Sequence, residues 1–196
     1  MIGTLLKQLI PQQLKRPVKR AVLNSWDSAR YGYSKGNLDS GNKHHVIFVC
    51  KGNICRSAFA EYYLRSVMAE GAHKIESCGL DVDQGLFSPQ EAVSVAKEFK
   101  VDLELHQSKG VASCDIHNAD LILPMEFRQY QRLKAMYPGK KSKIRLLRDF
   151  APWPDRLLCN ISDPYGSDED EFRRCFKRLQ RSLDGLKNHL AISENM

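Results

Sequence analysis

The chain has 196 residues, of which 42% are hydrophobic, and this is enough for one domain of about 150 residues plus an additional segment. No run of about 18 apolar residues occurs, which argues against a membrane-spanning helix. The six cysteines lack the spacing of zinc ligands and no signal peptide precedes them, so we expect a reduced, cytoplasmic protein without a metal or another cofactor.

The net charge of +7 is concentrated at the start of the chain. Residues 1–45 hold eight basic and two acidic residues, which leaves a charge of only +1 on the rest of the chain. A protein that binds nucleic acid usually carries a basic face on its folded body. We therefore expect no nucleic-acid binding, despite the high isoelectric point.

The composition of residues 1–43 predicts a basic extension that is partly helical or mobile. Apolar residues at helical spacing come first, and Pro11 and a basic run over 15–20 follow them. A basic amphipathic segment can lie on an anionic membrane or dock on a partner protein, and residues 1–20 are the candidate contact. A mobile tail and a helix that packs on the body are the alternatives.

After the extension, strands and helices alternate along the chain. Strands are predicted at 45–49, 74–78, 120–124 and 144–147, and helices at 57–70, 89–100, 126–136 and 168–190. This alternation predicts an α/β fold with a four-stranded parallel sheet and helices on both faces. Its expected form is a flavodoxin-like three-layer sandwich with a phosphate-binding loop after the first strand.

The first strand and the first helix of this body are joined by a loop of unusual composition. The apolar run 46–49 ends at Cys50, and Arg56 and Ser57 open the helical stretch. The loop therefore lies between the carboxyl end of a strand and the amino end of a helix, where α/β proteins bind ligands and where anions are favoured.

The loop backbone is suited to holding a tetrahedral anion. Gly52 and Asn53 tolerate left-handed conformations, which lets consecutive N–H groups point at one anion. The expected phosphate-binding residues are Lys51, Gly52, Asn53, Ile54, Cys55, Arg56 and Ser57.

The same loop favours a reactive cysteine. N–H donors and a nearby guanidinium favour the thiolate of Cys50, which is the nucleophilic form. Arg56 offers a planar fork that matches two phosphate oxygens. The hydroxyl of Ser57 is expected to donate a hydrogen bond to the sulfur.

The segment from Cys50 to Ser57, CKGNICRS, resembles the active-site loop of the low-molecular-weight protein tyrosine phosphatases. Far downstream, residues 162–165 (SDPY) resemble the Asp-Pro-Tyr acid loop of that family. Weaker similarities lie between these motifs, so the resemblance extends over about 46–190. It implies a low-molecular-weight phosphatase catalytic domain over residues 44–192.

The resemblance also implies roles for particular residues in the hydrolysis of protein phosphotyrosine. Cys50 would attack phosphorus to form a phosphocysteine, while Arg56 and the loop N–H groups hold the equatorial oxygens. Asp163 would protonate the leaving phenolate and then activate water. Tyr165 would line the pocket and stack on the substrate ring. Taken alone, Asp163 before a proline is also typical of an ordinary Asx turn.

Cys55 allows two interpretations. It is either a small packed residue at the start of the helix or a second thiol that captures an oxidised Cys50 as a reversible disulfide, which the resemblance favours.

Three other functions compete with phosphotyrosine hydrolysis. Arsenate reduction on the same scaffold needs two further thiols near Cys50, and residues 125–136 contain no cysteine. Relatives that hydrolyse phosphoarginine carry threonine at the position of Ile54, so the resemblance favours phosphotyrosine. A binding module that reads phosphate without turnover would lack the nucleophile or the acid, and both are present.

The expected partner is a phosphotyrosine protein. The resemblance to bacterial members of the family implies that this partner is a tyrosine kinase that controls exopolysaccharide export.

Overall fold

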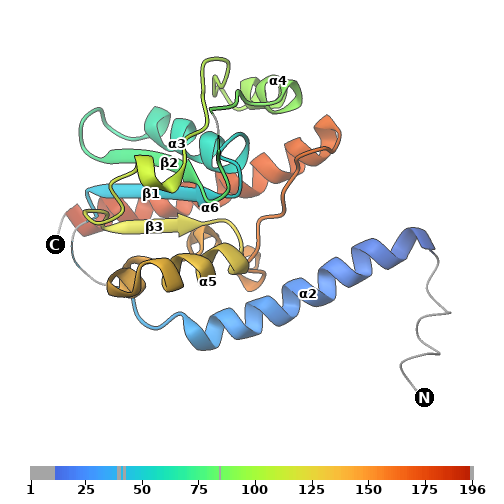
Figure 1. Ribbon diagram of the computed structural model, residues 1–196, viewed down its shortest axis with the longest axis horizontal. Coiled ribbons are helices and arrows are strands. Elements are labelled where there is room, and N and C mark those ends of the chain that lie inside the picture. Colours follow the sequence, from blue (N-terminus) through green and yellow to red (C-terminus); the bar gives the residue numbers. More distant parts are fainter. Residues whose placement is uncertain (1–11, 39–40, 42, 84, 195–196) are drawn as a thin grey trace.

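The computed structural model describes residues 12–38, 41, 43–83 and 85–194 (Figure 1). Three parallel strands lie at its centre in the order β2-β1-β3. β1 (His45–Cys50) is buried along its whole length and lies between β2 (Lys74–Gly79) and β3 (Leu121–Pro124). In register, Cys50 lies opposite Gly79, and Val49 lies opposite Pro124. The carboxyl ends of the three strands therefore meet at one edge of the sheet.

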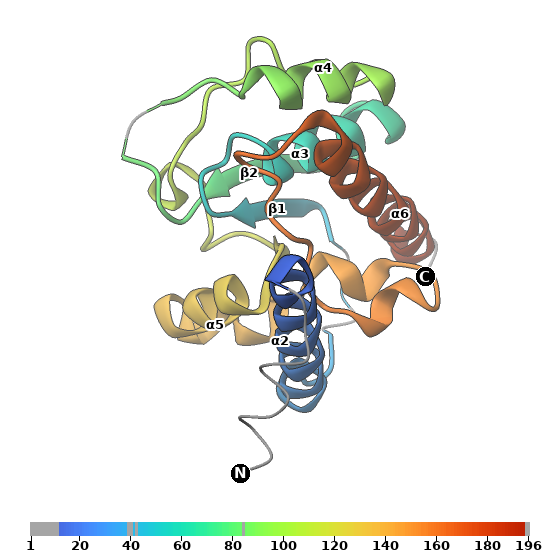
Figure 2. The ribbon, with the colours of Figure 1, turned by 90° about the vertical axis from the view of Figure 1, so that its right-hand side faces the viewer.

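Helices cover both faces of this sheet (Figures 1 and 2). One face is covered by α3 (Arg56–Val67), α4 (Gln90–Glu98) and α6 (Glu169–Glu194). The other face carries α5 (Phe127–Met136), with α2 (Gln12–Ser34) lying beside it. Short 3-10 helices occupy the connections at Val111–Ser113, Pro138–Lys143, Leu147–Phe150 and Asp155–Leu157.

Two apolar clusters, one on each face, hold these layers together. Alternate residues of a strand point to opposite faces, so Phe48 joins the cluster under α3 and α6 while Val49 joins the cluster under α5. Phe59 of α3 stacks on Phe176 of α6 with ring centroids 4.1 Å apart. The prediction of an α/β parallel sheet with helices on both faces is confirmed.

The prediction of a fourth strand at 144–147 is wrong. Only Ile144 pairs, through an isolated parallel bridge to Ile122, and the chain then turns into the 3-10 helix Leu147–Phe150. The backbone N–H of Leu146 donates instead to the hydroxyl of Tyr31, at 3.0 Å. The N–H of Arg145 donates to β3 at Ile122, so the N–H of Leu146 points away from the sheet, where the α2 side chain accepts it.

The predicted extension contains the long helix α2, and its second half packs on the body. Tyr31 is 3% exposed, and its hydroxyl donates to Asp149 at 2.5 Å. Its ring also makes an edge-to-face contact with Tyr130 of α5, at a centroid distance of 5.0 Å. Residues 1–11, which include the first apolar run, lie outside the described residues, so the expected contact of residues 1–20 with a membrane or partner stays a prediction. No helix in the described ranges has the length and apolarity needed to cross a bilayer.

Replacing Gly185 with alanine should destabilise the fold, because α6 touches the neighbouring backbone at this glycine. A Cβ at this position would lie 1.8 Å from the carbonyl oxygen of Phe150. We expect the Gly185→Ala variant to lose about 1–3 kcal/mol of unfolding free energy in a urea titration, the usual cost of overpacking. Gly139→Ala is the control, since its Cβ would meet nothing within 4 Å. Equal stability of the two variants would contradict this packing.

Candidate active site

The loop after β1 is organised around the buried side chain of Asn53. Asn53 adopts a positive φ of 51°, which is uncommon for residues other than glycine. Its Nδ2 donates to the hydroxyls of Ser57 at 2.9 Å and Ser77 at 2.8 Å, and its Oδ1 accepts from the N–H of Lys109 at 2.9 Å. His106 donates from Nε2 to the Asn53 carbonyl at 2.7 Å. One side chain therefore ties the loop to β2 and to the segment that follows α4.

His106 is neutral in this arrangement. Burial lowers its pKa, which outweighs the opposing effect of the hydrogen bond to Asn53. A neutral ring with its proton on Nε2 can donate to the loop carbonyl without placing a positive charge in the core.

The sulfur of Cys50 lies inside this loop, at the carboxyl end of the central strand. The residue is only 2% exposed. The N–H of Asn53 donates to Sγ at 3.2 Å, and the Ser57 hydroxyl lies 3.0 Å from the same sulfur. Donors directed at a sulfur favour its anionic form, so the geometry suits a thiolate nucleophile.

Arg56 opens α3, and its guanidinium is almost completely buried. Nη1 donates to the Ile161 carbonyl at 2.9 Å and to the carboxylate of Glu126, while Nη2 pairs with Asp163 at 2.7 Å. Burial alone would lower the pKa of Arg56, but the charges of Cys50, Asp163 and Glu126 raise it above its ordinary value. The guanidinium therefore stays fully charged at the base of the cleft.

The structure brings together the three predicted catalytic residues Cys50, Arg56 and Asp163. Asp163 is about one-third exposed, and Oδ1 accepts from the N–H of Tyr165 at 3.3 Å. Tyr165 is 64% exposed and does not line the cleft that contains Arg56. Its expected role as a pocket wall stays a prediction.

The remaining loop residues divide between the core and the cleft rim. Asn53, Cys55, Arg56 and Ser57 are buried, whereas Lys51 is exposed and lines the cleft. Burial, together with the charges of Cys50 and Asp163, raises the pKa of Cys55, so its thiol stays protonated.

A cleft of about 350 Å³ opens above this loop. Its walls are rich in charged side chains: Lys51, Arg56, Arg128 and Arg132 provide positive charge, and Asp81, Glu126 and Asp163 provide negative charge. Arg132 pairs with Asp81 at the rim. In the part of the chain that is described, no group of three or more His, Cys, Asp or Glu side chains is placed to hold a metal ion.

Two site residues were missed by the sequence analysis. Glu126 lies two residues after β3 and pairs with Arg56, and a charged residue so close to the end of a buried strand was an available signal. Gly79 ends β2, where a Cβ would lie 2.7 Å from the Lys51 carbonyl oxygen and 3.0 Å from the Asn53 nitrogen. Only glycine lets β2 approach the loop this closely.

A third missed element is the contact between α2 and the segment that leads to Asp163. The N–H of Cys159 donates to Ser28 at 3.0 Å, and the side-chain amide of Asn160 donates to Asp27 at 2.9 Å. The Asn160 Oδ1 accepts from the N–H of Phe127, the first residue of α5, at 2.7 Å. The acid loop is thus held between α2 and α5.

Comparison with known proteins identifies the family. Residues 45–195 match the model of the low molecular weight phosphotyrosine protein phosphatases. The chain belongs to this family. The phosphatase Wzb of Escherichia coli K12 is 37% identical over 139 residues, which cover 71% of this chain and 90% of Wzb. The helix α2 precedes the segment that the family model matches.

Solved structures of related phosphatases have the same fold. The crystal structure of the Erwinia amylovora tyrosine phosphatase AmsI matches with a TM-score of 0.68 and 28% identity, over 76% of this chain and 94% of AmsI. The arginine phosphatase YwlE of Geobacillus stearothermophilus matches with a TM-score of 0.69 and 25% identity, over 77% of this chain and 95% of YwlE.

Substitution of Asn53 by alanine should destabilise this phosphatase, because it removes the hydrogen bonds that organise the loop. The buried partners Ser57 and Ser77 would lose a donor, and alanine would have to keep a positive φ. We expect a loss of about 1–3 kcal/mol of unfolding free energy in a denaturant titration. Asn118→Ala is the control, since that exposed amide bonds only to Asp115 among the described residues. An Asn53→Ala variant as stable as this control would contradict the assignment.

Proposed function

We propose that this phosphatase hydrolyses phosphotyrosine in proteins through a phosphocysteine formed on Cys50. The observation that carries the proposal is the Cys50 sulfur, which accepts from an N–H and contacts a hydroxyl in the loop that ends at Arg56. The Arg56 guanidinium in turn pairs with Asp163. Clamp and acid are therefore in direct contact, and the nucleophile lies near enough for its charge to raise the pKa of Arg56.

In the first step, the Cys50 thiolate attacks phosphorus in line with the leaving phenol. The phosphorus–oxygen bond breaks while Asp163 transfers its proton to the departing oxygen. Arg56 and the loop N–H groups hold the three equatorial oxygens, on which the transition-state charge lies. These oxygens take the place of the Asp163 carboxylate on Arg56, and the released carboxylate takes up a proton from solvent before it acts as the acid.

In the second step, Asp163 accepts a proton from water as the water oxygen attacks the phosphocysteine. The sulfur leaves as a thiolate and inorganic phosphate is released. A hydrogen bond from the Ser57 hydroxyl stabilises the leaving sulfur. The same contact therefore serves both steps.

The depth of the nucleophile favours an aromatic substrate. Cys50 is almost completely buried, so the phosphoryl group must reach down from the rim. A tyrosine side chain is long enough for this, and serine or threonine is too short. We further propose that exposed Tyr165 stacks on the substrate ring when it binds.

The setting of the reaction is proposed on weaker support. We propose a cytoplasmic protein with a catalytic domain over 44–192 and a basic extension over 1–43, acting on a phosphotyrosine protein such as a tyrosine kinase of exopolysaccharide export. Support comes from the relatives named tyrosine phosphatase and from the six free cysteines. We also propose that Cys55, which shares an apolar cluster with Cys50, captures it as a disulfide under peroxide oxidation.

The alternative functions have less support. Phosphoarginine is the relevant second substrate, because the similar structure YwlE is an arginine phosphatase. For arsenate reduction, the thiols Cys78 and Cys114 lie in the cluster on the other sheet face, and burial raises the pKa of Cys175, which shares the cluster of Cys50. A module that binds phosphate without hydrolysing it would not need an acid such as Asp163 paired with Arg56.

The assay of choice compares p-nitrophenyl phosphate, a phosphotyrosine peptide and a phosphoarginine peptide under reducing conditions. Cys50→Ser should reduce kcat by roughly a thousandfold or more, and Asp163→Asn should reduce it by roughly a hundredfold. Cys114→Ser, a buried thiol on the other sheet face, should stay close to wild type. Absence of turnover in the wild-type protein would refute the proposed enzymatic activity. Faster hydrolysis of the phosphoarginine peptide than of the phosphotyrosine peptide would change the assigned substrate.

Loss of the link between α2 and the acid loop should slow proton transfer selectively. Asp27→Ala removes the acceptor for Asn160. We expect kcat for phenyl phosphate to fall about fivefold, the equivalent of one hydrogen bond, with a smaller change for p-nitrophenyl phosphate, whose phenolate leaves without a proton. Ser25→Ala is the control on the same helix, where the hydroxyl bonds only to the Ala21 carbonyl among the described residues. Equal effects on both substrates would indicate a general structural defect.

A further inference from the structure

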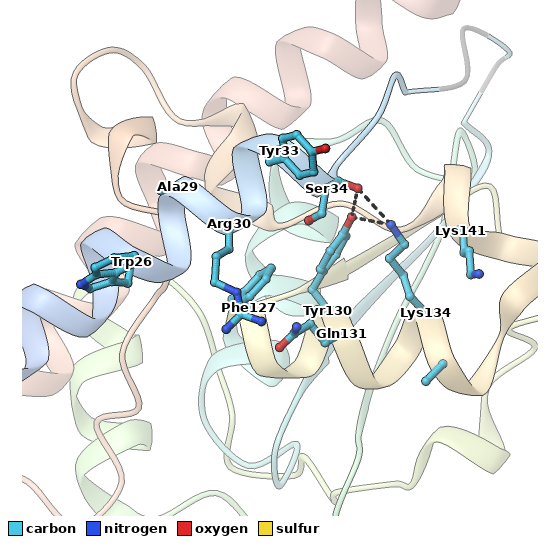
Figure 3. A pocket seen from close by; sticks show the side chains of 11 residues that line it. Trp26, Ala29, Arg30, Tyr33, Ser34, Phe127, Tyr130, Gln131, Lys134 and Lys141 are labelled. Carbon is cyan, nitrogen blue, oxygen red and sulfur yellow. Dashed lines mark hydrogen bonds between the residues drawn. The ribbon is translucent and has the colours of Figure 1, made fainter.

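A second hollow lies between α2 and α5, away from the catalytic loop (Figure 3). Its volume is about 750 Å³. Both helices contribute its walls, and Lys141 extends them beyond α5. We call this hollow the α2–α5 pocket.

The α2–α5 pocket is aromatic and positively charged. Its lining includes the cations Arg30, Lys134 and Lys141 but no carboxylate. Arg30 lies over the ring of Phe127, 5.5 Å from its centroid, as Figure 3 shows. Lys134 donates to the Ser34 carbonyl at 3.1 Å and lies 4.8 Å from the centroid of Tyr130. These contacts fix two cations in place without cancelling their charge.

Two large aromatic side chains remain open to solvent at this pocket. Trp26 is 68% exposed and Tyr33 is 96% exposed, and both lie on α2. Exposed aromatic rings together with arginine are typical of the surfaces that bind proteins. A pocket with aromatic rings and cations is complementary to a peptide that carries carboxylates and apolar side chains.

The pocket lies beside the catalytic cleft along both of its helices. On α5, Phe127 lines the pocket, while its neighbour Arg128 lines the cleft. On α2, Arg30 lines the pocket, while Asp27, one turn earlier, lines a groove that reaches Asp163. A ligand in the pocket can therefore belong to the same molecule as a phosphate in the cleft.

We propose that the α2–α5 pocket binds an acidic segment of the phosphoprotein whose phosphotyrosine occupies the cleft. This proposal rests on the proposed function and adds the class of substrate. Along α5, Arg128 lines the cleft and Lys134 lines the pocket, a rise of roughly 9 Å, which about three extended residues can span. The acidic residues are therefore expected about three to six positions from the phosphotyrosine.

The shape of the pocket favours a peptide over a lipid surface. Arg30 and Lys134 line a hollow between two helices, whereas a membrane-bound amphipathic helix lays one exposed face flat on the bilayer surface. One wall is α2, which precedes the residues matched by the family model. The selectivity is thus a property of this chain and its added helix.

The test measures a ratio that cancels any general loss of activity. Two phosphotyrosine peptides are compared that differ only in glutamate or glutamine at positions three to six from the phosphotyrosine. We expect kcat/KM for the glutamate peptide to exceed that for the glutamine peptide about fivefold in low salt, and the preference to decrease as salt is added. In the Arg30→Glu/Lys141→Glu variant, the ratio should fall to one or below.

The matched control is Lys177→Glu/Lys187→Glu, which makes the same charge change on exposed positions of α6. It should keep the wild-type ratio. An unchanged ratio in the pocket variant, or no preference in the wild-type protein, would overturn the proposal. Equal loss of the ratio in both double variants would also overturn it, since net charge alone would then explain the preference.

A binding measurement separates this proposal from the proposed function. Affinities of both peptides for the Cys50→Ser protein, with and without the pocket substitutions, are measured by fluorescence anisotropy. A preference for glutamate that depends on Arg30 and Lys141 supports the pocket even if the wild-type protein hydrolyses neither peptide. Binding to vesicles that contain anionic lipid, lost in the pocket variant and accompanied by no peptide preference, would assign the pocket to a membrane and overturn the proposal.

Discussion

The buried guanidinium of Arg56 is the interaction on which the arrangement of the site depends. A charged group removed from water is costly unless its donors are satisfied by charged or polar partners. Arg56 obtains these partners from Glu126 after β3 and from Ile161 and Asp163 in the acid loop. Segments more than a hundred residues apart are therefore fixed around one side chain, and this side chain is also the one that a phosphate would bind.

The added helix α2 extends this network beyond the segment that the family model matches. Asp27 bonds to Asn160, three residues before Asp163, and Asn160 also accepts from the first N–H of α5. Tyr31 accepts the N–H of Leu146 on the outer side of the segment that bridges to β3 at Ile144. The helix thus contributes to the sheet edge and to the acid loop, and it is part of the folded body over these residues.

Local patterns singled out the candidate catalytic residues because each lies in a short motif, and the strand before Cys50 was evident from its apolar run. The patterns also gave three strands and the helices α3 to α6 to within a few residues. They failed at 144–147, where an apolar segment looks like a strand but forms a single bridge before the chain turns into the 3-10 helix Leu147–Phe150. Glu126, Asn160 and Gly79 were missed because their roles arise from contacts between distant segments.

Helical periodicity explains how α2 can serve two purposes without conflict. Side chains three or four positions apart share a face, so Asp27 and Tyr31 point toward the body. Trp26, Arg30 and Tyr33 follow the same spacing on the adjacent face and line the α2–α5 pocket. Because one face binds the acid loop and the other is open to a ligand, substitutions can change recognition without moving Asp163. Conversely, a ligand held on the open face is placed next to the acid by a helix that is already anchored to it.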